Sequence, residues 1–145
     1  MEEAAYRIDY PLAYARSTRV VAFDEIAEET VRSVSGGPWG QAQFYTASDS
    51  GGELITLEGQ RRPMLLEIDQ SDSVVMVATN SVVSAAAAAV GAACRERSIM
   101  TAGLLLLDAG PLGGEALSAL RPYARILLVP ADKDDLFELL RAIRA

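Results

Sequence analysis

The chain has 145 residues, half of them hydrophobic, which is the usual length of one domain and enough apolar material for a substantial core. Its 20 acidic and 13 basic residues give a formal net charge of −7, so a basic surface for nucleic acid is not expected. The chain has no histidine, the commonest general base and metal ligand. A single cysteine, Cys94, allows neither an internal disulfide nor a cysteine-cluster zinc site, and we expect it to be a small buried apolar residue.

The first residues, MEEAAYRIDY, lack the basic-then-apolar order of a signal peptide, so a cytoplasmic location is expected. Residues 1–18 show no clear period and are predicted to form an N-terminal arm. Residues 73–94 carry no charge and are long enough to cross a bilayer. Thr79, Asn80, Ser81 and Ser84 interrupt this run, however, and alanine contributes little to insertion. A buried strand followed by a buried helix explains the run better than a membrane span.

The first half of the chain predicts one helix, two strands and one ambiguous segment. In RVVAFDEIAEETVRSVSGG the apolar residues recur at helical spacing, with acids early and Gly36 at the stop position. QAQFYTA and ELITLEG are typical of strands. The linking SDSGG is short enough for a hairpin turn, so a hairpin and two parallel strands both remain open. QRRPMLLEIDQSD fits a short helix opened by Pro63 or a strand, and we favour the helix.

From residue 73 onward, strands and helices alternate strictly. The expected strands are SVVMVAT, MTAGLLLLD and ARILLVPAD, and their lack of alternation predicts burial on both faces. The expected helices are an Ala-rich segment over about residues 82–97, a short helix within GPLGGEALSALRPY, and the amphipathic KDDLFELLRAIRA. This order predicts a single α/β domain over residues 19–145. We expect a three-layer, Rossmann-like sandwich of about five mainly parallel strands with helices on both faces.

The Ala-rich helix is thin and apolar around its whole girth, which predicts burial on more than one side. In a chain of this length a second copy is the simplest cover, so we expect a homodimer formed through this helix. The alternative is that the N-terminal arm covers the same side.

Ligands of open parallel sheets bind beyond the carboxyl ends of the strands. Hydroxyl groups after the first and the middle strand can donate to an anion, which the start of the Ala-rich helix also favours. The alternative is that one of them merely caps the helix. Asp49, Asp108 and Asp132 could hold Mg²⁺ there, as in phosphate-transfer receivers, but Asp132 also fits a helix cap and Asp108 a turn. The candidate ligand-binding residues are Ser48, Ser50, Thr79, Asn80, Ser81 and Ser84.

The run TNSVVS, after a buried strand and before an Ala-rich helix, resembles the phosphosugar-binding loop of sugar isomerase (SIS) domains, which typically show Ser-x-Ser-Gly-x-Thr. FYTASDSG lies where such domains carry a Gly/Ser turn, and LSALRPYARILLVPA is similar to the approach to their last strand. The likeness covers about residues 23–135 in the order of elements, and Val82 stands where glycine is usual. It implies that a sugar phosphate is held by Ser48, Ser50, Thr79, Ser81 and Ser84.

We therefore expect a small SIS-like domain that binds a phosphorylated sugar or similar anionic metabolite and is weakly catalytic or non-catalytic. Any activity would resemble that of a phosphosugar isomerase, but no catalytic residue stands out, and neither a cofactor nor a metal is expected. The alternative is a ligand-free protein-interaction or scaffold module with the same fold.

Overall fold

A computed structural model describes residues 17–82, 84–106 and 114–145, so most of the expected N-terminal arm lies outside the described residues. The strands are β1 (Thr18–Ala22), β2 (Ala42–Ala47), β3 (Glu53–Thr56), β4 (Arg61–Pro63), β5 (Ser73–Ala78), β6 (Met100–Leu106) and β7 (Ile126–Ala131). The helices are α1 (Glu25–Ser35), α2 (Met64–Asp69), α3 (Ser84–Glu96), α4 (Gly114–Leu120) and α5 (Lys133–Ala142). No helix in these ranges is long and apolar enough to cross a bilayer.

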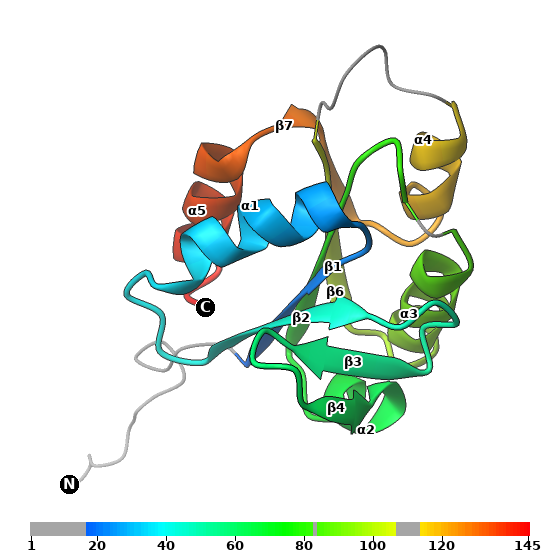
Figure 1. Ribbon diagram of the computed structural model, residues 1–145, viewed down its shortest axis with the longest axis horizontal. Helices are drawn as coiled ribbons and strands as arrows, with labels where there is room; N and C mark the ends of the chain where they lie inside the picture. Colours follow the sequence, from blue (N-terminus) through cyan, green and yellow to red (C-terminus); the bar gives the residue numbers. More distant parts are fainter. Residues whose placement is uncertain (1–16, 83, 107–113) are drawn as a thin grey trace, which may run out of the picture.

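The described strands form one mixed sheet in the order β4-β3-β2-β1-β5-β6-β7 (Figure 1). The five strands from β2 to β7 in this order are parallel to their neighbours, whereas β3 pairs antiparallel with both β2 and β4. The predicted α/β class is confirmed. The sheet has seven strands where about five were expected, because β1 and β4 were not recognised in the sequence. Residues 41–58 form a hairpin, which settles the choice that the sequence left open.

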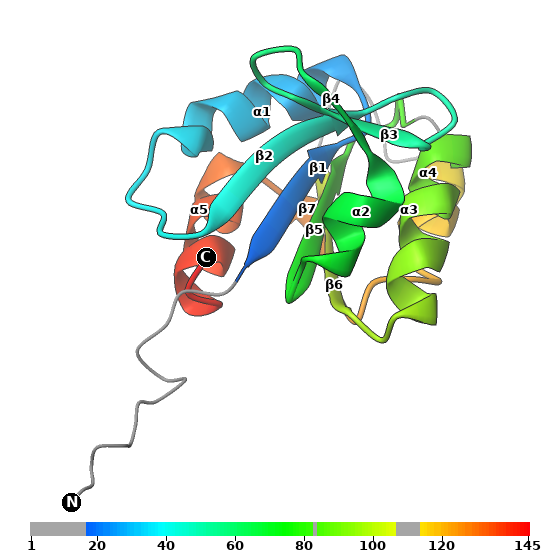
Figure 2. The same cartoon turned by 90° about the horizontal axis from the view of Figure 1, so that it is seen from below.

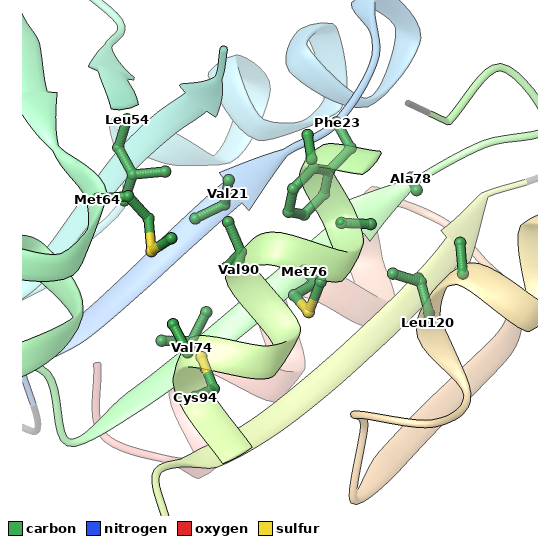
Figure 3. Packing of buried hydrophobic residues seen from close by; sticks show 14 of the residues in the cluster. Val21, Phe23, Leu54, Met64, Val74, Met76, Ala78, Val90, Cys94 and Leu120 are labelled. Atoms are coloured by element: carbon green, nitrogen blue, oxygen red, sulfur yellow. The ribbon is translucent and has the colours of Figure 1, made fainter. Parts of the chain in front are cut away.

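Helices lie on both faces of the sheet: α1 and α5 on one, and α2, α3 and α4 on the other (Figures 1 and 2). Side chains alternate across β1 and β5 and so feed two separate cores. Val21 and Met76 pack with Val90 of α3 and Leu120 of α4 (Figure 3). Their chain neighbours pack on the opposite face, with Leu136 and other side chains of α5.

The central strand β1 was missed because its sequence, TRVVA, runs directly into the helical pattern that begins at Phe23. Val20 and Val21 are fully buried between β2 and β5. The helix itself begins only after Asp24, whose Oδ1 accepts a hydrogen bond of 2.8 Å from the backbone N–H of Ala27. An aspartate at this position ends the strand and satisfies one of the free N–H groups of the first helical turn. The helix stops at Gly36, as expected.

The two strands predicted to be doubly buried in the middle of the sheet, β5 and β6, are interior and parallel to their neighbours, as expected. The same prediction is wrong for β7. This strand is the last in the sheet order and leaves Ile126 and Val129 exposed to 42% and 38%. All three strands are apolar in sequence. The greater exposure of β7 therefore comes from its position at the edge of the sheet.

The short helix α2 forms as favoured, with Pro63 at its N-cap position. A buried polar cluster joins α2 to the sheet. In this cluster, Arg19 Nε lies 3.3 Å from Glu67 Oε1. The Tyr45 hydroxyl lies 2.5 Å from the same carboxylate oxygen. Arg19 and Glu67 are only 3% and 8% exposed, so each charge depends on the other. Burial, and then the hydrogen bond to Glu67, raise the pKa of Tyr45 above its usual value.

The small side chains of α3 match close neighbours within the chain. Gly51, in the turn between β2 and β3, lies so near α3 that a Cβ on it would be 2.8 Å from the Cβ of Ala89. A Cβ on Gly91 would be 2.3 Å from Cγ of Tyr123. Cys94 is fully buried, and burial raises the pKa of its thiol to about 11. The thin girth of α3 therefore does not by itself require a second copy, and the homodimer stays a prediction.

Trp39 folds onto the edge of the core. Its indole N–H donates to the carbonyl of Val34 at 2.7 Å, and its ring lies 5.0 Å from that of Phe137 in α5. This contact joins the turn after α1 to the last helix.

Candidate functional site

A cavity of about 600 Å³ opens at the carboxyl ends of β1 and β2 and beside the turn after β5. We call it the carboxyl-edge cavity. It lies at the carboxyl end of the central strand β1, which has β2 on one side and β5 on the other. This is the usual position for ligands in open α/β sheets. Its lining residues are Ala22, Phe23, Asp24, Glu25, Ile26, Glu28, Thr46, Ala47, Asp49 and Ser81.

Asp24, which lines this cavity, joins two of the turns around it by hydrogen bonds. One carboxylate oxygen caps α1 through Ala27, and the other accepts a hydrogen bond of 2.7 Å from the backbone N–H of Thr79, after β5. The backbone N–H of Phe23 also donates to the carbonyl of Val77 at 3.0 Å. Asp24 thus fixes the turn after β1 against the turn after β5, and both of its oxygens are already engaged.

The remaining acids of the carboxyl-edge cavity differ in their partners. Glu28 is paired with Arg32 one helical turn along α1, at 2.8 Å. Glu25 and Asp49 have no hydrogen-bond or ion-pair partner in the described part of the chain. Among the described residues, the lining contains carboxylates and no basic residue. Such a cavity favours hydroxyl, amine or cationic groups over anions, since two like charges 4 Å apart cost about 1 kcal/mol even in bulk water.

Of the predicted hydroxyl residues after β5, one stabilises a buried turn and the others are exposed. Thr79 is fully buried, and its Oγ1 accepts a hydrogen bond of 3.0 Å from the backbone N–H of Ser81. This hydroxyl closes a local turn of the kind that serine and threonine often form. Ser81 is exposed and lines the carboxyl-edge cavity, Ser84 is exposed as the first residue of α3, and Asn80 is half-buried. Of the six predicted ligand-binding residues, only Ser81 contributes to the cavity lining.

The two predicted residues after β2 serve the hairpin turn. Ser48 Oγ accepts from the backbone N–H of Glu53 at 3.1 Å, and Ser50 Oγ accepts from that of Gly52 at 3.2 Å. Gly51, directly after Ser50, has a φ of +80°, a conformation that glycine adopts without strain. Because β3 turns back beside β2, the oxygens of these serines stabilise the turn, and neither serine lines the cavity.

Asp49 and Asp132, two of the three acids considered for a magnesium site, border separate hollows. Asp132 caps α5 and exchanges hydrogen bonds with Asp135 in a capping box, which is the alternative that the sequence analysis gave for it. It borders a separate hollow of about 330 Å³ with Glu29 and Lys133, whereas Asp49 lines the carboxyl-edge cavity. Asp108 lies outside the described residues. Within the described ranges, no three acidic or thiol groups are grouped closely enough to hold a metal ion.

Asp24 and Glu25 were not predicted as candidate site residues, because the apolar pattern of the sequence does not separate β1 from the helix that follows it. The signal was present, since a β-branched run followed by Asp-Glu marks a strand end and a helix start. Neither a protein-family model nor a curated protein matches the chain.

Proposed function

We propose that the domain binds a small hydroxyl- or amine-bearing metabolite in the carboxyl-edge cavity, as a binding domain without turnover. The observation that carries this proposal is the pair of carboxylates, Glu25 and Asp49, which have no partner in the described chain and line a cavity of about 600 Å³ to which the described residues contribute no basic group. A volume of this size suits a small-molecule ligand. Carboxylates accept hydrogen bonds from hydroxyl groups and pair with amines, so a sugar, a polyol or an amine matches the lining.

A phosphorylated sugar, the ligand implied by the SIS resemblance, is the second candidate. Its hydroxyl groups would face the carboxylates, and its phosphate would lie toward Ser81, Ser84 and the start of α3. The exposed hydroxyls of these serines and the helix dipole favour an anion there. The carboxylates oppose it, because a phosphate dianion near Glu25 and Asp49 is repelled. The first candidate is therefore the better match to the charge of the lining.

Binding without turnover is proposed because the chain lacks histidine and Asp24 already accepts two backbone hydrogen bonds. A proton transfer would fall to Glu25 or Asp49, the lining carboxylates that have no partner in the described chain.

The test is a thermal-shift screen followed by calorimetry on the full chain, with neutral sugars and polyols, polyamines, sugar phosphates and Mg²⁺ as ligands. A ligand that binds only the folded state raises the melting temperature by mass action. We expect a neutral or amine ligand to stabilise the wild type, and Asp49→Asn to reduce that shift. The matched control is Glu58→Gln, which removes one exposed negative charge in the turn after β3 and should leave the shift unchanged.

Two further results decide between the candidates. A shift seen only with sugar phosphates, and lost in Ser81→Ala/Ser84→Ala, would replace the first candidate with the second. If no ligand class stabilises the protein at millimolar concentration, both fail and the interaction-module alternative is favoured.

A further inference from the structure

A second cavity, of about 410 Å³, lies at the opposite edge of the sheet, where β6 and β7 begin. We call it the amino-edge cavity. It is bordered by the end of α3 and by the segment that links α4 to β7, and α3 and α4 lie side by side (Figures 1 and 2). Its polar lining consists of Arg95, Ser98, Thr101, Tyr123 and Arg125, and no carboxylate of residues 17–82, 84–106 or 114–145 lines it.

Arg95 is held in place by an aromatic ring. Its guanidinium carbon lies 4.9 Å from the centre of the Tyr123 ring, within the range of a cation–π contact. The ring in turn lies against Gly91, one turn earlier in α3, where any side chain would collide with it. Stacking of this kind leaves the N–H groups at the edge of the guanidinium available to a ligand.

Arg125 enters the cavity from the other side. Its backbone N–H donates to the carbonyl of Thr101 at 2.8 Å, which fixes the start of β7 against β6. Thr101 is buried, and its hydroxyl donates to the carbonyl of Ile99. The two arginines thus line the cavity from separate parts of the chain, the end of α3 and the residue before β7.

These arginines differ from the paired arginines elsewhere in the chain. Arg19, Arg32 and Arg97 each have a carboxylate partner. Arg61 and Arg141 are paired as well. Arg95 and Arg125 have no such partner in the described part of the chain, and neither do Arg62, Arg121 and Arg144, but of these five only Arg95 and Arg125 line the amino-edge cavity. The position of Arg95 in the last turn of α3 would account for one cation there, because the helix dipole favours it, but not for Arg125 or for the cavity.

We propose that the amino-edge cavity binds a small phosphorylated metabolite through Arg95 and Arg125. Guanidinium groups bind phosphate oxygens bidentately, and the exposed Ser98 can add a hydroxyl donor. The ligand is compact, because a net charge of −7 on the protein repels an extended polyanion while a cavity of this size admits a metabolite. This site is separate from the carboxyl-edge cavity and does not rest on the function proposed for it.

The experiment is isothermal titration of the full chain at low salt with inorganic phosphate, with a sugar monophosphate and with the same sugar lacking phosphate. We expect binding of both phosphate compounds and none of the bare sugar at this site. Arg95→Gln and Arg125→Gln should each weaken binding roughly tenfold or more, as expected for the loss of a charge-assisted hydrogen bond. Raising the salt concentration to 0.5 M should weaken it as well, since both side chains are exposed.

The matched control is Arg62→Gln, which removes one exposed positive charge on β4, at the other end of the strand order. It should leave phosphate affinity unchanged. Equal weakening by all three variants would overturn the proposal, because it would show attraction by overall charge. Absence of phosphate binding at millimolar concentration would overturn it too. Binding that is lost in Ser81→Ala/Ser84→Ala but kept in both arginine variants would place the phosphate at the carboxyl edge instead.

Discussion

The two cavities at opposite edges of the sheet carry opposite charge. At the carboxyl edge, Glu25 and Asp49 line a space to which the part of the chain that the structure describes adds no basic residue. At the amino edge, Arg95 and Arg125 line a space to which it adds no carboxylate. A sheet of parallel strands gathers the turns after the strands at one edge and the turns before them at the other, so one domain can hold two chemically distinct sites.

The rule that ligands bind at the carboxyl edge correctly predicted where a cavity lies. The predicted hydroxyl residues, however, do not set the charge of its lining. The residues that set its charge follow β1 and β2, whereas four of the six predicted hydroxyl or amide residues follow β5. The arginine side chains, which suit a phosphate better, lie at the edge that the rule passes over. Position in the fold therefore suggests where a ligand binds, and the side chains decide which ligand.

The largest effect is expected from the residue that supports the carboxyl edge rather than from one that would touch a ligand. Asp24→Ala removes the N-cap of α1, worth about 1 kcal/mol, and leaves the backbone N–H of Thr79 without its acceptor, worth a further 1–3 kcal/mol or so. We expect a loss of about 2–4 kcal/mol in the free energy of unfolding, measured by urea denaturation. A loss below about 0.5 kcal/mol would mean that Asp24 is not structural and would return it to the ligand-binding acids.

A smaller effect is expected at the helix that lines the amino edge. Gly91→Ala improves helix propensity by about 1 kcal/mol but forces the Tyr123 ring away, and overpacking of this kind costs about 1–3 kcal/mol. We expect a net loss of about 1 kcal/mol in urea denaturation, together with weaker phosphate binding, because Arg95 loses the ring on which it stacks.

The control for this substitution is Gly36→Ala, at the end of α1, where an added Cβ meets no atom within 4 Å. It should be neutral or stabilise the protein slightly, by about 0.5 kcal/mol, through the unfolded state. A gain in stability for Gly91→Ala with unchanged phosphate affinity would show that Tyr123 does not shape the amino-edge cavity.

The second half of the fold was predictable because its signals are local. SVVMVAT and MTAGLLLLD are apolar without alternation, and β5 and β6 are indeed covered on both faces. What could not be predicted is which strands lie at the sheet edges. ILLVPA is as apolar as its neighbours, yet β7 is an edge strand, because that depends on the order in which distant segments pair. β1 was lost for a related reason: a five-residue strand was absorbed into the pattern of the helix that follows it.

Residues of the carboxyl-edge cavity could be predicted only where the strand before them runs parallel to its neighbours and the chain does not turn straight back. Ser81 lines the carboxyl-edge cavity because β5 is parallel to β1 and ends at the same edge. Ser48 and Ser50 were expected there too, but the antiparallel return of β3 places their oxygens in the hairpin turn. Arg95 and Arg125 are 30 positions apart in the sequence and line one cavity only because α3 ends beside the segment after α4. The spacing of residues in the sequence does not predict such a pair.

The smallest effect on stability is expected for Asp49→Asn, the variant that should reduce ligand binding at the carboxyl edge. Asp49 is exposed and unpaired in the described chain, so its loss should change the free energy of unfolding by less than about 0.5 kcal/mol. The sign should be stabilising at low salt, because one negative charge is removed from a protein of net charge −7, and the gain should fade as salt screens the remaining repulsion. Urea denaturation at low and high salt measures both. A loss greater than about 1 kcal/mol would show that Asp49, like Asp24, holds the edge together, and it would then no longer count as a carboxylate free to meet a ligand.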